Sequence, residues 1–175
     1  MAVCIINNVH EFKVYSVLMV YLLQELMTLK QKIYGHYLQL INEKVMSLQN
    51  ILADLKESGA NESKSTAGDK HETALAMLQI EQANTRAQLK EAQDQKTVLE
   101  NINPAISPAV IVNGSLITTD KGYLFLSTAL GKATIDGITV IALSQHSPLG
   151  IQLMGLREGD TTTINGNCYA IENVA

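Results

Sequence analysis

The sequence has little of several residue types: no tryptophan, two phenylalanines, three prolines and two cysteines in 175 residues. Cys4 and Cys168 lie at opposite ends of the chain, without a Cys-x-x-Cys pair or a Cys/His cluster at metal-ligand spacing. This argues against a disulfide framework and against a structural zinc site. We therefore expect a protein of a reducing compartment, the cytoplasm, with Cys168 as a small buried residue of a strand.

Positive charge is also scarce, because 13 Lys and Arg stand against 17 Asp and Glu and give a net charge of −4. A protein that holds duplex nucleic acid through its own surface needs a basic face, so this function is disfavoured. The four histidines, His10, His36, His71 and His146, are scattered through different parts of the chain. No nucleophile–base set is visible, which argues against a stand-alone enzyme.

Long hydrophobic runs are absent except for residues 14–23, which is about half of the roughly 20 residues that a membrane-spanning helix needs. No basic cluster precedes this run and no small-x-small cleavage site follows it. We expect no membrane contact and interpret residues 1–26 as an apolar N-terminal extension that is not native, with translation beginning at Met27. An extension of the next helix and a secretory signal are the alternatives.

Residues 27–102 are predicted to form an antiparallel coiled-coil hairpin. Apolar residues recur at alternating steps of four and three, the pattern of a heptad seam. They are Tyr34, Leu38, Ile41, Val45, Leu48, Leu52 and Leu55. A second helical stretch at 69–101 has a weaker seam, and the small and polar residues between the two predict a tip near 57–72. Each arm of about 30 residues would be roughly 45 Å long.

The rest of the chain changes character after a linker at 103–108, where Pro104 and Pro108 cannot continue a helix. Residues 109–175 are predicted to form a compact β-rich domain with one short helix, which makes the whole chain α+β. We expect strands at 109–112, 115–119, 122–126, 137–143, 161–164 and 168–171. The helix at 147–156 has Ser147 as its N-cap and Pro148 at its first position.

One acidic motif stands out, Gly-Asp-Lys-His-Glu-Thr-Ala at residues 68–74. A spacing of three puts the carboxylates of Asp69 and Glu72 on one side of the first turn of a helix. One interpretation is a variant capping box that completes the helix end. The other is a pair of oxygen ligands that helps to hold a divalent cation such as Mg²⁺ in the active site of a partner.

The motif at 68–74 and the stretch at 147–160, Ser-Pro-Leu-Gly-Ile-Gln-Leu-Met-Gly-Leu-Arg-Glu-Gly-Asp, resemble motifs of the bacterial Gre-type transcript cleavage factors. The resemblance covers residues 27–175 and implies a hairpin followed by a domain similar to FK506-binding proteins at 109–175. It also implies an accessory factor of RNA polymerase, rather than an enzyme, that enters the secondary channel and acts on the 3′ end of the nascent RNA only indirectly. The protein is expected to be a monomer.

The resemblance further implies roles for particular residues. Asp69 and Glu72 would help to hold a catalytic Mg²⁺ shared with the polymerase, which cleaves backtracked RNA by its own reaction. Ser147, Pro148, Leu149 and Leu153 would contact the polymerase. Two alternatives stay open: a channel-binding regulator without cleavage activity, as some members of the family are, and a structural or chaperone-like protein whose hairpin is a dimerisation rod.

Overall fold

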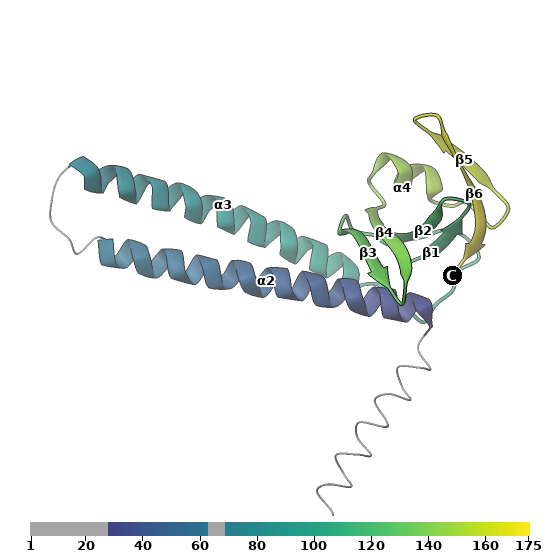
Figure 1. The fold of residues 1–175 in the computed structure, drawn as a ribbon, viewed down its shortest axis with the longest axis horizontal. Helices are drawn as coiled ribbons and strands as arrows, with labels where there is room; N and C mark the ends of the chain where they lie inside the picture. Colours follow the sequence, from purple (N-terminus) through teal and green to yellow (C-terminus); the bar gives the residue numbers. More distant parts are fainter. Residues whose placement is uncertain (1–27, 63–68) are drawn as a thin grey trace, which may run out of the picture.

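The computed structural model describes residues 28–62 and 69–175, and for residues 61, 62 and 69–72 it describes the backbone alone. The predicted extension at 1–26 lies outside the described residues. Two long helices come first, followed by six strands and one short helix (Figure 1). They are α2 (Leu29–Glu62), α3 (Asp69–Glu100), β1 (Leu116–Thr119), β2 (Gly122–Ser127), β3 (Gly131–Ile135), β4 (Ile138–Ser144), α4 (Pro148–Leu153), β5 (Thr161–Ile164) and β6 (Asn167–Val174). The prediction of an α+β fold is confirmed.

Helix α2 begins with a capping box. The Oγ1 atom of Thr28 accepts a hydrogen bond from the backbone N–H of Gln31 at 3.3 Å, and the Oε1 atom of Gln31 accepts one from the backbone N–H of Thr28 at 2.8 Å. This reciprocal pair satisfies donors that the first turn of a helix leaves free. The helix then continues to Glu62, further than the composition of residues 57–62 suggested.

Helices α2 and α3 run side by side in opposite directions, as the heptad pattern predicts (Figure 1). Ile41, Val45 and Leu48 are buried in the seam. The polar side chains of the α3 seam have hydrogen-bond partners. Thr85 is buried, and its hydroxyl donates to the carbonyl oxygen of Glu81. The Nε2 atom of Gln82 donates to the carbonyl oxygen of Leu55 at 3.0 Å, which links the two helices near their distal ends.

The strands form one sheet in the order β3-β4-β2-β1-β6-β5. The pairs are antiparallel except for β2 and β4, which run parallel. Two-residue turns join β3 to β4 and β5 to β6, and Asp136 and Asn165 adopt positive φ angles of 50° and 49° there. Each is followed by a glycine with positive φ, the backbone that suits the twist of a hairpin and that Asp-Gly and Asn-Gly pairs favour.

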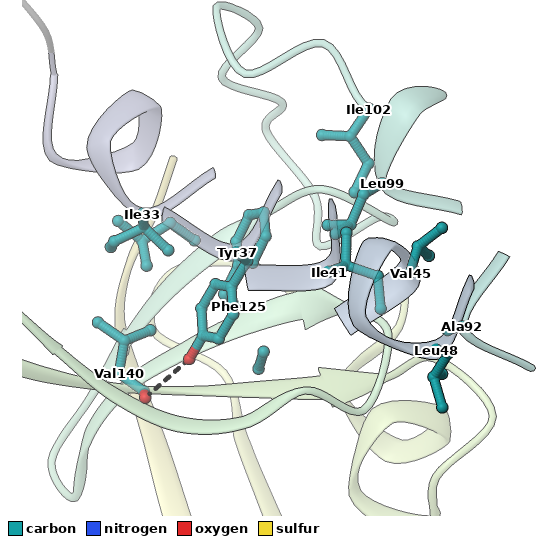
Figure 2. Packing of buried hydrophobic residues seen from close by; sticks show 12 residues of the cluster. Ile33, Tyr37, Ile41, Val45, Leu48, Ala92, Leu99, Ile102, Phe125 and Val140 are labelled. Atoms are coloured by element: carbon teal, nitrogen blue, oxygen red, sulfur yellow. Dashed lines mark hydrogen bonds between the residues drawn. The ribbon is translucent and has the colours of Figure 1, made fainter. Parts of the chain in front are cut away.

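Both faces of the central strands are buried, by different parts of the chain. Alternate residues of β2 divide between two apolar clusters, with Phe125 in one and Leu124 and Leu126 in the other. The Phe125 cluster includes Ile33, Tyr37 and Ile41 of α2 (Figure 2). The other cluster includes Leu153 of α4. Because α2 supplies both the hairpin seam and the cover of one sheet face, the hairpin is packed onto the sheet.

Two features of the strand prediction are wrong. Residues 131–135 form strand β3, which the sequence did not suggest, whereas residues 109–112 form no strand. Ile111 is instead fully buried: its N–H donates to the carbonyl of Leu156 and its carbonyl accepts from the N–H of Gly155. An apolar run can thus enter the core as an irregular segment when isolated backbone hydrogen bonds satisfy its polar groups.

Candidate functional site

The acidic motif lies at the start of α3, at the end of the hairpin far from the sheet (Figure 1). Asp69 is the first residue of this helix and Glu72 lies three residues further along it. This backbone placement puts both residues in the first turn, as predicted. The side chains of Asp69 and Glu72 lie outside the described residues, so their roles as ligands or as capping groups stay predictions.

Helix α4 has the N-terminal cap that the sequence predicts. Ser147 has an extended backbone, its Oγ atom accepts a hydrogen bond from the N–H of Gly150 at 3.0 Å, and Pro148 occupies the first turn. The hydroxyl of Ser147 also donates to the carbonyl of Ser144 at 2.6 Å. These two bonds fix the direction in which α4 leaves strand β4.

Gly150 explains why the motif has a glycine inside such a short helix. A Cβ atom at this position would lie 2.1 Å from the carbonyl oxygen of Ser144 and 3.0 Å from the Cα atom of Gln145. Since these are backbone atoms, they cannot move aside as a flexible side chain would. The glycine therefore lets α4 pack closely against the end of β4.

The four residues predicted to contact a polymerase differ in how exposed they are to solvent. Pro148 is exposed, Ser147 and Leu149 are half-buried, and Leu153 is fully buried in the cluster beneath the sheet. The Leu153 side chain anchors α4 to the sheet and offers no surface to a partner.

The exposed apolar residues of the α4 segment are Ile151, which is 61% exposed, and Met154, which is 41% exposed. Ile151 was not among the predicted contact residues. Its position, two residues from both Leu149 and Leu153, was the available signal, because such neighbours point to different sides of a helix.

Along the second arm, basic side chains are spread out rather than gathered. Arg86 is exposed and donates to the side-chain oxygen of Gln82 at 3.2 Å, while Lys96 forms an ion pair with Glu100 at 3.6 Å. Exposed pairs of this kind contribute little to stability. Lys90 is also exposed. These three residues provide isolated positive charges and no continuous basic face.

Among the residues whose side chains the structure describes, 28–60 and 73–175, no group of three or more His, Cys, Asp or Glu residues is placed to hold a metal ion. Cys168 is free and exposed on β6, so the expectation that it is buried is wrong. Its neighbour in the chain, Tyr169, is half-buried, and the ammonium of the exposed Lys121 lies 4.8 Å from the centre of its ring. None of the helices in the described part of the chain is long and apolar enough to cross a membrane.

The chain was compared with protein families, curated proteins and solved structures. No protein-family model matches the chain, and no curated protein matches it. Among solved structures, one described as the structure of the transcription factor Gfh1 is 15% identical, with 82% of this chain and 91% of that chain covered and a TM-score of 0.29. A match at this level of identity and superposition leaves the family of the chain open.

Proposed function

We propose that this protein is a transcription elongation factor that inserts its hairpin into the secondary channel of RNA polymerase and stimulates cleavage of backtracked RNA. The polymerase performs the reaction, and the protein acts as an accessory factor. The proposal rests on the resemblance of residues 68–74 and 147–160 to the Gre-type motifs. It is supported by a fold in which these two motifs occupy opposite ends of an elongated molecule (Figure 1).

The observation that carries the proposal is the place of Asp69 and Glu72. They lie in the first turn of a 32-residue helix, so about 48 Å of helix separates them from its base. An arm of this length and the width of two helices can enter a channel too narrow for a globular domain. Carboxylates at its end would reach a buried active site while the sheet stays outside.

The residue types at the tip fit a divalent cation. Mg²⁺ binds oxygen ligands in octahedral geometry and is usually held by one or two carboxylates together with other oxygens. Asp69 and Glu72 supply two carboxylates, and the remaining ligands would come from the polymerase and the RNA. The bound cation would polarise the phosphate and activate the attacking water. The part of this chain is to bring the two carboxylates to the cation.

The exposed side of α4 is suited to hold the globular domain at the channel entrance. Pro148, Ile151 and Met154 present apolar surface there, and Leu153 fixes the helix from below. Apolar side chains at the centre of a small patch are typical anchors of protein–protein contacts. Under this proposal the apolar patch on α4 determines the affinity for the polymerase, whereas the hairpin tip determines how strongly RNA cleavage is stimulated.

The test measures RNA shortening in a stalled, backtracked elongation complex with the cognate polymerase. The D69N/E72Q variant should lose Mg²⁺-dependent cleavage by at least about a hundredfold while still competing for the channel, the loss expected when a group that stabilises the transition state is removed. The matched control is E91Q/D94N, which removes two exposed carboxylates with the same spacing from the same helix. This control should cleave like the wild type.

Other outcomes separate the alternatives. If the wild type binds the polymerase without stimulating cleavage, the protein is a channel-binding regulator and the acidic pair is a helix cap. If it does not bind the polymerase and forms a dimer through the hairpin, the structural or chaperone-like alternative is correct. Sedimentation of the free protein distinguishes this last case, because the proposal expects a monomer.

A further inference from the structure

Helix α3 has a second row of regularly spaced residues, which lies about 180° around the helix from the seam with α2. We call it the outer row. Its members recur at steps of four and three, and all of them are exposed: Ala76, Ile80, Ala83, Ala87, Lys90, Asp94 and Thr97. Helix α3 thus has two faces with heptad spacing, and α2 packs on only one of them (Figure 1).

The outer row changes from apolar to polar halfway along the arm. Its members within residues 76–87, the distal half, are alanine and isoleucine, and those within 90–97 are all polar. Ile80 is 62% exposed, and Met77, three residues before it on an adjacent part of the surface, is 66% exposed. A helix face that meets only water is typically polar along its length. The distal half is therefore suited to a partner and the proximal half to solvent.

The outward side of α2 at the same level is polar. The hydrogen bond from Gln82 to the carbonyl oxygen of Leu55 shows which parts of the two helices lie opposite each other. Around this level, the α2 residues that lie away from the seam are Asn50, Asp54 and Glu57, and all three are exposed. The apolar surface thus belongs to one side of the distal hairpin.

The apolar part of the outer row is too small to hold two copies of this chain together. It is about 17 Å long and, at the width of one helix, about 10 Å wide, which is on the order of 170 Å². A stable complex buries about 800 Å² on each partner. The row therefore suits a partner that is already held by another contact, because the second contact then forms at a high effective concentration.

We propose that the apolar part of the outer row, together with Met77, packs against an α-helix in the wall of the polymerase channel. This inference rests on the proposed function, in which the patch on α4 supplies the other contact. Heptad spacing is the geometry of one helix lying along another, and the alanines would let the two backbones approach closely. The row begins seven residues after Asp69, so a partner that receives the tip must pass this face.

The point at which the outer row becomes polar indicates how far the hairpin enters. Ala87 lies 18 residues after Asp69, which corresponds to about 27 Å of helix. Lys90 and Asp94 follow on the same face, and burying unpaired charges against an apolar helix would be costly. We therefore expect the contact to end near Ala87, with the rest of the arm outside it.

The first test compares two native methionines of the full chain. Met77 lies beside the outer row, whereas Met46 of α2 is 62% exposed and nine residues nearer to the base than Leu55, outside the expected contact. Both are oxidised by hydroxyl radicals in the free protein and in a stalled, backtracked elongation complex, and the sulfoxides are counted by mass spectrometry. In the complex Met77 should oxidise at least about fivefold more slowly, and Met46 at an unchanged rate.

Variants test whether the contact holds the hairpin in place. Met77→Gln/Ile80→Gln removes the two large apolar side chains and should raise the protein concentration for half-maximal RNA cleavage at least about tenfold. Met46→Gln/Ile51→Gln is the matched control, because it makes the same changes at exposed positions of α2 and should behave like the wild type. The D69N/E72Q variant should still protect Met77, since its outer row is intact.

The outcomes separate this inference from the proposed function. If the wild type stimulates cleavage while Met77 stays as reactive as in the free protein, the inference is overturned and the proposed function stands. Equal half-maximal concentrations for the two Met/Ile double variants overturn the inference as well. If the wild type does not bind the polymerase, both are overturned. Protection of Met77 in the free protein at high concentration, lost on dilution, would assign the outer row to a second copy of the chain instead.

Discussion

Tyr37 of α2 stacks on Phe125 of β2, with ring centroids 6.1 Å apart and ring planes 6° from parallel. Both side chains are fully buried (Figure 2). The hydroxyl of Tyr37 lies 3.0 Å from the carbonyl oxygen of Gly131 and 3.1 Å from that of Val140, and it shares its proton between them. One side chain of the hairpin thus contacts three strands of the sheet.

We predict that Tyr37→Ala lowers the free energy of unfolding by about 3–5 kcal/mol, the usual cost of emptying a large aromatic site. Tyr37→Phe retains the ring and should cost only about 1 kcal/mol, the typical net value of one hydrogen bond. Urea unfolding followed by circular dichroism measures both. Lys32→Ala, which removes the exposed ion pair with Asp136, is the control and should cost less than about 1 kcal/mol. Equal losses for the two Tyr37 variants would contradict this account.

Replacing two of the glycines by alanine is predicted to change the stability of the protein in opposite directions. Gly150→Ala should destabilise the protein by at least about 2 kcal/mol, because the new Cβ atom would overlap the Ser144 carbonyl. Gly35→Ala in α2 has no atom within 4 Å of the new Cβ and should stabilise the protein by about 0.5–1 kcal/mol. Thermal unfolding of the two variants beside the wild type checks the signs. A neutral Gly150→Ala would show that α4 can move away from β4.

The stability of the protein should depend on the protonation of Lys30. Burial lowers the pKa of this ammonium below 10.5, so the unfolded chain binds the proton more tightly than the folded chain. Between the lowered pKa and 10.5, the free energy of unfolding therefore rises with pH, and at lower pH the full cost of the buried charge is present. The wild type should accordingly gain stability relative to Lys30→Met over this range.

Tyr37 acts in the opposite direction at the upper end of the same range. Burial raises the pKa of its phenol above 10.0, so the unfolded chain ionises first and stability falls as the pH passes 10.0. Urea unfolding of wild type and Lys30→Met at a series of pH values up to 10 separates the two effects. Parallel stability curves for the two proteins would contradict the assignment to Lys30.

The exposed side of α4 gives a prediction about binding. Ile151→Glu and Met154→Glu should each weaken competition for the polymerase at least tenfold, or about 1.4 kcal/mol, without changing the unfolding temperature. Both side chains are exposed, so their replacement removes contact surface and leaves the core intact. Ile106→Glu adds the same charge at an exposed apolar position outside α4 and is the control. If all three variants bind equally well, α4 is not the docking surface.

Much of the architecture could be predicted from the sequence because its signals are local. The heptad seam from Tyr34 to Leu55 predicted the paired helices, and the Asp136-Gly137 pair is typical of a tight turn. Strand β3 was missed although that turn requires a strand on each side, since residues 131–135 begin with Gly-Lys-Ala and are β-branched only at Thr134 and Ile135. The second apolar stripe of α2, Ile33 and Tyr37, is visible in the sequence, but nothing local says that a sheet covers it.

The candidate sites were predictable to different degrees. Ser147 as N-cap followed from residue type and the proline after it. The spacing indicated that Ile151 lies on a different side of the helix from Leu149 and Leu153. It did not indicate which side is buried, because a helix of six residues has too few turns to define an apolar face. The buried Lys30 had no sequence signal at all. Its burial depends on a segment 76 positions away, where the carbonyl oxygen of Ile106 accepts a hydrogen bond from the ammonium.

The packing of Ile33, Tyr37 and Ile41 against the sheet also has a mechanical consequence. The hairpin is a lever whose length magnifies any looseness at its base: a rotation of about 10° there would move the end of a 48 Å arm by about 8 Å. A group that holds a ligand must be placed with an accuracy much better than this displacement. The dense core at the base therefore fixes the position of the distant end of the hairpin. Mutations near Tyr37 would displace this end without changing any residue of the tip.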